Sequence, residues 1–176
     1  MQYRYGMMNG RFQPFHLEHL RYFRLVWKQC ERVIVGITNP DPSTTVADES
    51  NDHRHLPEEN PFTFVERLMM IQETLRTEGY PMQRIHIVPM PIHHPDRWRH
   101  YIPDGTVIFV VVYTDWEKKK AERLRAAGYE VVEVDRFDKE ISGQQIRSLI
   151  RAGGTWEKLV PPSVAQFIRQ RPGSGL

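Results

Sequence analysis

The sequence predicts an α/β protein: a single doubly wound sheet of five parallel strands with helices on both faces. Short runs rich in β-branched and aromatic residues alternate from end to end with amphipathic, helix-like segments. Such alternation is typical of parallel sheets whose crossovers are helices, which makes the expected fold Rossmann-like. The length of 176 residues fits one domain. We expect this domain to span residues 1–170 and residues 171–176 to form a flexible tail.

Five segments have the length and composition of strands. They are residues 3–8, 32–38, 84–90, 106–113 and 129–134. The ligands of doubly wound folds bind at the carboxyl ends of the strands, where the strand order reverses. The turn after the first strand and the segment "EISGQQIR" after the fifth are both expected at that edge.

Four segments between or after these strands have helical features. The spacing of Leu20, Phe23, Val26, Trp27 and Cys30 predicts the first helix, with Cys30 on its apolar side. Three further helices follow from capping signals: Thr63 and Glu66 form a capping-box pattern before a helix that Gly79 would end, residues 115–127 precede Gly128, and Ser142 can cap the last.

The segment 39–61 is a long stretch without periodicity, which predicts a loop insertion. Connections longer than about 12–15 residues are uncommon in compact domains and are often lids or binding loops. A solvated insertion and a functional lid both remain open for this segment.

Composition argues against several classes of partner. Lys and Arg exceed Asp and Glu by only 24 to 22, and the basic residues are scattered, so we expect no nucleic-acid partner. No apolar run approaches the ~20 residues that a membrane-spanning helix needs, and the N-terminus lacks a signal-peptide pattern. The single cysteine, Cys30, excludes an internal disulfide and fits a reducing compartment. These features predict a cytoplasmic protein.

The turn "GRFQPFHLEH", residues 10–19, has the chemistry of a phosphate site. Gly10 lets a ligand approach the backbone, and the helix that starts near His16 presents free N–H groups and the positive end of its dipole. His16 and His19 lie three residues apart on one helix face, and Arg11 adds a bidentate cation.

A metal site is the alternative for the paired histidines. The chain has eight histidines, but it lacks strong ligand spacings such as H-E-x-x-H or paired C-x-x-C. We therefore predict no metal-ligating residues.

Two motifs resemble the signatures of the HxGH nucleotidyltransferase superfamily, which includes the cytidylyltransferase-like proteins. "GRFQPFHLEH" is similar to GxFxPxHxGH, and "ISGQQIR" is similar to ISxTxxR. With "NPFTFVERLMM" at residues 60–70, the chain most resembles the archaeal-type nicotinamide-mononucleotide adenylyltransferases, from residue 3 to about residue 168.

The resemblance implies transfer of a nucleoside monophosphate from a nucleoside triphosphate to a phosphate-bearing acceptor, with release of pyrophosphate. By likeness, His16 and His19 would contact the α- and β-phosphates, and Arg147 would hold the β- and γ-phosphates. Mg²⁺ would bridge the phosphates as a cofactor. The resemblance also implies a set of nucleotide-binding residues, which are Gly10, Arg11, Phe12, Glu18, Ser142 and Gly143.

Glu18 stands where the superfamily has glycine, and it narrows the space beside the first helical turn. Its carboxylate could accept a hydrogen bond from a ribose hydroxyl or from the exocyclic amine of adenine or cytosine. The alternative is a solvated glutamate that the helix dipole stabilises.

The acceptor side of the site matches the archaeal enzymes less well. Trp98 falls where they carry a tryptophan that stacks on the nicotinamide ring, although a buried core tryptophan is an equal alternative. Nicotinamide-mononucleotide adenylylation is the default activity. The alternative is a cytidylyltransferase for a small phosphorylated or phosphonate acceptor, with His55 and Arg97 among the acceptor-binding residues. A non-catalytic nucleotide-binding module is the alternative from another class, and a homo-oligomer remains open.

Overall fold

The computed structural model describes residues 1–44, 56–113, 115–134 and 140–171, apart from the side chains of Thr44 and Trp116. Its centre is a sheet of five parallel strands in the order β3-β2-β1-β4-β5. The strands are β1 (Tyr3–Gly10), β2 (Cys30–Thr38), β3 (Ile85–Met90), β4 (Thr106–Val111) and β5 (Glu130–Val134). The predicted fold class is confirmed, because the strands are parallel and the order reverses beside the central strand β1.

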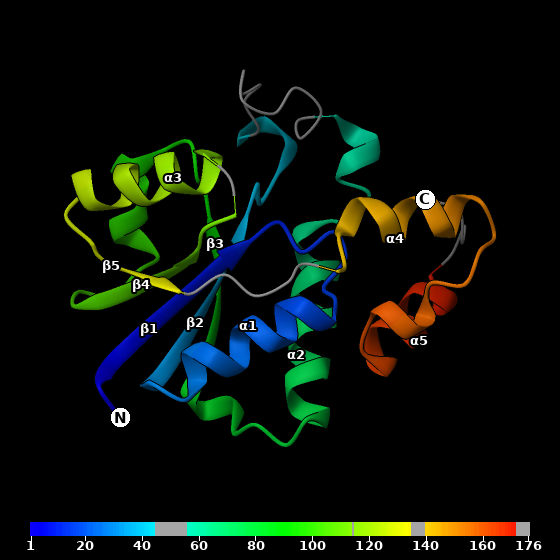
Figure 1. Ribbon diagram of the computed structural model, residues 1–176, viewed down its shortest axis with the longest axis horizontal. Coiled ribbons are helices and arrows are strands. Elements are labelled where there is room, and N and C mark those ends of the chain that lie inside the picture. Colours follow the sequence, from blue (N-terminus) through cyan, green and yellow to red (C-terminus); the bar gives the residue numbers. More distant parts are fainter. Residues whose placement is uncertain (45–55, 114, 135–139, 172–176) are drawn as a thin grey trace.

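Helices cover both faces of this sheet (Figure 1). In the described part of the chain the α-helices are α1 (Leu17–Trp27), α2 (Phe64–Thr77), α3 (Asp115–Ala126), α4 (Gly143–Arg151) and α5 (Pro162–Gln170). Helices α1, α2, α4 and α5 contribute to one hydrophobic core, and α3 contributes to a second core on the opposite face. Within the described residues, no helix combines the length and apolar character needed to cross a membrane.

Successive side chains along each central strand point alternately into the two hydrophobic cores. Met8 of β1 belongs to the first core and its neighbour Met7 to the second. Ile34 of β2 and Ile108 of β4 likewise face the second core, whereas the residues on either side of them face the first. This period of two, on strands that are apolar on both faces, is the pattern of a parallel sheet covered on both sides.

The carboxyl edge of the sheet opens beside β1. The pairing of β1 with β2 continues to Gly10, but its pairing with β4 ends at Met7, opposite Ile108. The last residues of β1 therefore have a strand partner on one side only. This opening lies where the strand order reverses, the usual place for a ligand in a doubly wound sheet.

Cys30 is the clearest correction to the expected elements. Helix α1 ends at Trp27, and Cys30 is the first residue of β2 rather than part of the helix. The thiol is nevertheless buried as expected, and burial raises its pKa to about 11. It is therefore a protonated, inert thiol at neutral pH.

The predicted helix caps are confirmed. Thr63 and Glu66 form a capping box on α2, and Gly79 and Gly128 follow the ends of α2 and α3 with positive φ. Of the predicted 39–61 insertion, residues 45–55 lie outside the described residues. Of the predicted tail, Arg171 is described and forms hydrogen bonds, whereas 172–176 lie outside the described part.

Candidate active site

The first signature turn leads from β1 into α1. Phe12 has a positive φ of 53°, and its ring lies over Gly10, where a Cβ atom would come within 2.9 Å of the ring. A side chain at position 10 would thus displace the Phe12 ring. Gly10 and Phe12 therefore shape this turn, which ends at His16, the N-cap residue of α1.

His16 and His19 lie together in the first turn of α1, as the sequence predicts. Their rings are stacked with centroids 3.5 Å apart, and the His16 backbone N–H donates to Nδ1 of His19 over 3.2 Å. Because Nδ1 accepts, a neutral His19 ring carries its proton on Nε2. His19 therefore keeps an N–H donor on the ring nitrogen that does not cap the helix.

The second signature begins α4, and it contacts the first turn directly. Ser142 caps α4 by accepting from the Gln145 N–H over 3.1 Å. A Cβ atom on Gly143 would lie 2.7 Å from the carbonyl oxygen of Gln13, so only glycine allows this approach without a backbone shift. The N-termini of α1 and α4 are thus brought together, and both are places where backbone N–H groups bind anions.

Arg147 joins this contact from within α4. Its Nη1 donates to the carbonyl oxygen of Gln13 over 2.7 Å, and its Nη2 pairs with the carboxylate of Glu59. The Arg147 side chain is 1% exposed, and burial lowers its pKa. The arginine predicted to hold phosphates is therefore paired with Glu59, a residue of η2 (Pro57–Glu59) that sequence reasoning did not single out.

Glu18 has a role that neither sequence interpretation anticipated. Its Oε1 accepts hydrogen bonds from the backbone N–H groups of Glu140, over 2.5 Å, and of Ile141, over 2.9 Å. The side chain at the superfamily glycine position is thus bonded to the protein backbone through Oε1 rather than simply solvated. It joins α1 to the backbone at the start of the second signature.

This contact predicts different behaviour for two variants of Glu18. Glu18→Gln keeps an acceptor oxygen and should stay near the wild type, whereas Glu18→Gly, which restores the superfamily residue, should lose both bonds. We expect Glu18→Gly to cost about 1–3 kcal/mol of stability, because bonds to a charged group are lost. It should also raise the KM for the nucleoside triphosphate that the resemblance implies, because α1 and the second signature are no longer joined by this side chain. Thermal denaturation and steady-state kinetics of both variants check this. A Glu18→Gly protein with unchanged KM and melting temperature would contradict it.

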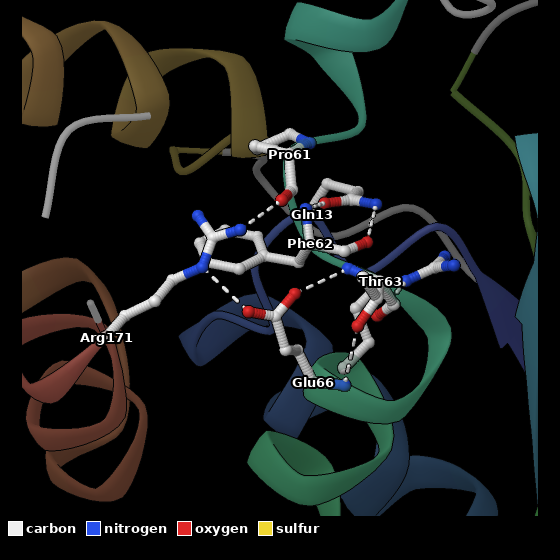
Figure 2. Close-up of polar contacts among 7 residues, drawn as sticks. Gln13, Pro61, Phe62, Thr63, Glu66 and Arg171 are labelled. Atoms are coloured by element: carbon white, nitrogen blue, oxygen red, sulfur yellow. Dashed lines mark hydrogen bonds and ion pairs between the residues drawn. The ribbon is translucent and has the colours of Figure 1, made fainter. Parts of the chain in front are cut away.

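The start of α2 is fixed to the same turn (Figure 2). The Gln13 side-chain amide donates to the Phe62 carbonyl and accepts from the Phe62 N–H, both over 2.9 Å. Arg171 donates to Glu66 and to the Pro61 carbonyl, which ties the residue that follows α5 to the capping box of α2. The motif "NPFT", residues 60–63, thus holds the signature turn in place through the bonds between Phe62 and Gln13.

Arg67 is a second supporting cation that the sequence analysis missed. It is 2% exposed and donates to the carbonyl groups of Arg11, Thr38, Asn39 and Thr63. Burial lowers its pKa to about 10, which still leaves it charged at neutral pH. Arg67 therefore fixes the backbone that follows β1 relative to the end of β2.

The predicted acceptor residues are not all brought together. Trp98 of η4 (Pro95–His100) is 1% exposed in the second core, and its Nε1 donates to the Pro91 carbonyl over 2.8 Å. This matches the core alternative, because a ligand could stack on the ring only if the surrounding side chains moved. Arg97 is exposed, and His55 lies outside the described residues.

The described residues include no group of three or more His, Cys, Asp or Glu side chains that could hold a metal ion. His53 and His55 fall outside this statement, since they lie in 45–55. In the described residues, His16 and His19 form part of a turn between helix N-termini.

The comparisons with known proteins agree with this geometry. The family model described as cytidylyltransferase-like matches residues 7–150, which include both signatures. The chain belongs to the cytidylyltransferase-like family. The predicted resemblance is thereby confirmed, and with it the assignment of the chain as a nucleotidyltransferase.

Members of the cytidylyltransferase-like family with two different activities are similar to this chain. One is a phosphonoformate cytidylyltransferase of Streptomyces viridochromogenes, 43% identical over 94% of this chain and 90% of that protein. Another is a nicotinamide-nucleotide adenylyltransferase of Thermococcus kodakarensis, 35% identical over 96% of this chain and 84% of that protein.

Among solved structures, a bifunctional NMN adenylyltransferase/ADP ribose pyrophosphatase from Francisella tularensis has a similar fold, with a TM-score of 0.71 and 17% identity. The match covers 96% of this chain and 51% of that one, so this chain spans about half the length of the bifunctional protein.

Proposed function

We propose that this nucleotidyltransferase is a CTP-dependent cytidylyltransferase whose acceptor is a compact phosphonate. The observation that carries the choice is the burial of Trp98, whose ring is 1% exposed and whose N–H is bonded to Pro91. A pyridinium acceptor needs a flat partner, and this ring does not offer one. A compact anionic acceptor needs no stacking surface.

One relative supports the same choice of acceptor. The Streptomyces relative is named a phosphonoformate cytidylyltransferase, and phosphonoformate is a phosphonate that bears a carboxylate directly on phosphorus. Basic and imidazole side chains follow β3 in the segment 91–100, namely His93, His94, Arg97, Arg99 and His100. Charge-assisted hydrogen bonds from such groups suit a small acceptor with two acidic functions.

In the proposed reaction, a phosphonate oxygen attacks the α-phosphorus of CTP. A new P–O–P bond forms, the bond from the α-phosphorus to the oxygen that bridges it to the β-phosphate breaks, and pyrophosphate leaves with that electron pair. The attacking oxygen is already ionised at neutral pH, so no general base is required. The contribution of the protein is then positioning and charge stabilisation. We propose that His16, His19 and the N-terminus of α4 bind the triphosphate.

Nicotinamide-mononucleotide adenylylation is the second candidate. It is favoured by the archaeal relatives, which are named nicotinamide-nucleotide adenylyltransferases and are 33–35% identical to this chain over 96% of its length. It requires the Trp98 ring to become accessible when the acceptor binds.

A matrix of substrates separates the two candidates. The triphosphates ATP, CTP, GTP and UTP are each paired with nicotinamide mononucleotide and with phosphonoformate, and pyrophosphate release is measured. We expect the highest kcat/KM for CTP with phosphonoformate, at least about ten-fold above any pair that contains ATP, which corresponds to about 1.4 kcal/mol. A preference for ATP with nicotinamide mononucleotide would establish the second candidate instead.

Mg²⁺ is the proposed cofactor, and it fits the described residues because a cation carried by the phosphates and water needs no protein cage. Bound to the triphosphate, it neutralises phosphate charge. We expect a chelator to abolish turnover and Mg²⁺ to restore it, with no stoichiometric zinc in the purified protein. Activity that survives chelation, or elemental analysis that finds zinc, would contradict this prediction.

The remaining expectations concern location and assembly. We propose a reducing, cytoplasmic location, which the buried and protonated thiol of Cys30 supports. The absence of a nucleic-acid partner and the formation of a homo-oligomer stay predictions.

A further inference from the structure

Asn9 is a buried amide at the carboxyl edge of the sheet, next to the signature turn. It is the penultimate residue of β1 and pairs with Gly36 of β2. On its other side, the pairing of β1 with β4 has already ended at Met7. Asn9 therefore lies at the opening where the strand order reverses.

The Asn9 side chain has no hydrogen-bond partner among the residues that the structure describes. The residue is 5% exposed, and neither Oδ1 nor Nδ2 of its amide has a partner. Gln13, four residues further along, is a buried amide whose donor and acceptor are both bonded to Phe62. Because an unsatisfied buried amide is destabilising, one beside a binding edge points to a ligand that satisfies it.

The position of Asn9 on β1 indicates which ligand it faces. Alternation places Asn9 on the same side of the sheet as Met7, and a Cβ atom on Gly36 would lie 3.3 Å from both the Asn9 and the Met90 Cβ atoms. Helices α1 and α4, whose N-termini form the proposed triphosphate site, pack on the opposite side, in the first core. Asn9 and the triphosphate site therefore lie on different sides of the central strand.

In-line transfer places the attacking oxygen and the leaving pyrophosphate on opposite sides of the α-phosphorus. The proposed triphosphate site lies on the α1 and α4 side of β1. An acceptor that meets the in-line requirement therefore approaches from the other side of β1, where Asn9 lies. The basic segment 91–100 also starts there, directly after Met90, and Trp98 and Ile102 anchor it in the second core.

We propose that Asn9 is an acceptor-binding and specificity-determining residue, whose Nδ2 donates a hydrogen bond to an acidic oxygen of the compact acceptor. This inference rests on the proposed function, since it names a contact for the acceptor of that reaction. A side-chain amide suits this contact because its NH2 group donates a hydrogen bond to an anion but carries no charge. A positive charge at this position would slow the release of the product after transfer.

The test compares Asn9→Leu, Asn9→Asp and the matched control Gln13→Leu, which removes a buried amide that the protein itself satisfies. Steady-state kinetics gives separate KM values for phosphonoformate and CTP. Titration calorimetry measures phosphonoformate binding to each protein saturated with α,β-methylene-CTP, and thermal denaturation gives the melting temperature.

We expect Asn9→Leu to raise the phosphonoformate KM and Kd about ten- to hundred-fold, as the loss of one hydrogen bond to a charged group does, with the CTP KM within about three-fold of wild type. Asn9→Asp matches asparagine in shape but adds a negative charge, so its loss should be at least as large. The melting temperature of Asn9→Leu should equal or exceed that of the wild type, whereas Gln13→Leu should lower it.

An unchanged phosphonoformate KM and Kd in Asn9→Leu would overturn the proposal. So would a fall in the melting temperature of Asn9→Leu as large as that of Gln13→Leu, because it would mean that the folded protein already satisfies the amide. If wild-type protein neither binds phosphonoformate nor transfers a nucleotidyl group to it, both this inference and the proposed function fail. If wild-type protein does both and Asn9→Leu matches it, only this inference fails.

Discussion

Replacing His16 or His19 by alanine should lower turnover about 100- to 1,000-fold, the usual effect of removing one preorganised donor to developing negative charge. The two rings stack in the first turn of α1, and the bond from the His16 N–H to Nδ1 of His19 places the proton of a neutral His19 on Nε2, the nitrogen that we propose donates to a phosphate oxygen. Single-turnover kinetics with saturating triphosphate measures the chemical step.

His19→Gln separates this role from helix capping. Glutamine at the third helical position can accept from the N-cap backbone N–H, as in a capping box, but it lacks the imidazole Nε2–H. We expect His19→Gln to match the wild type in melting temperature and His19→Ala in activity. If both alanine variants keep activity within a few-fold of wild type, the phosphate-site assignment is wrong.

Arg147→Ala should produce the largest loss of stability. It leaves the Glu59 carboxylate, 16% exposed, without its partner and removes a bond to the Gln13 carbonyl. Removing one partner of a buried ion pair costs about 3–5 kcal/mol, which for a chain of this size lowers the melting temperature on the order of 10 °C. Thermal denaturation checks this, and a melting temperature within about 2 °C of wild type would contradict it.

The predicted phosphate role of Arg147 is tested separately with Glu59→Gln, which removes the competing charge and keeps a hydrogen-bond acceptor. If Arg147 also contacts the triphosphate, Glu59→Gln should keep or lower the triphosphate KM, because the guanidinium no longer has an anionic partner to exchange. Arg147→Lys keeps a charge but loses the bidentate fork, so it should raise that KM. A KM unchanged in Arg147→Lys would limit Arg147 to a structural role.

Local patterns predicted the fold well. Strand-like runs located all five strands, and the Thr63–Glu66 and Ser142 capping signals located two helix starts, because these features depend on neighbours three or four residues away. Cys30 was misplaced because an apolar residue at the end of a helical pattern also fits the start of a buried strand. Periodicity alone does not distinguish the two in so short a stretch.

The site was harder to predict because its supporting contacts join distant parts of the chain. The two motifs located His16, His19 and Ser142, but Glu18 meets backbone groups more than 120 residues later. Arg67 and Glu59 were missed for the same reason, since their partners lie in other elements. The orphaned amide of Asn9 has no sequence pattern, because its significance comes from the partners that it lacks in the folded chain.

If this enzyme joins CMP to a compact phosphonate, ³¹P NMR should identify the product directly. Wild-type protein is incubated with CTP, phosphonoformate and Mg²⁺, with ATP and nicotinamide mononucleotide as the parallel reaction. We expect two new mutually coupled doublets from a phosphonate–phosphate anhydride, together with one equivalent of pyrophosphate. A spectrum without these doublets from CTP and phosphonoformate, alongside a new dinucleotide from ATP and nicotinamide mononucleotide, would contradict the proposed function.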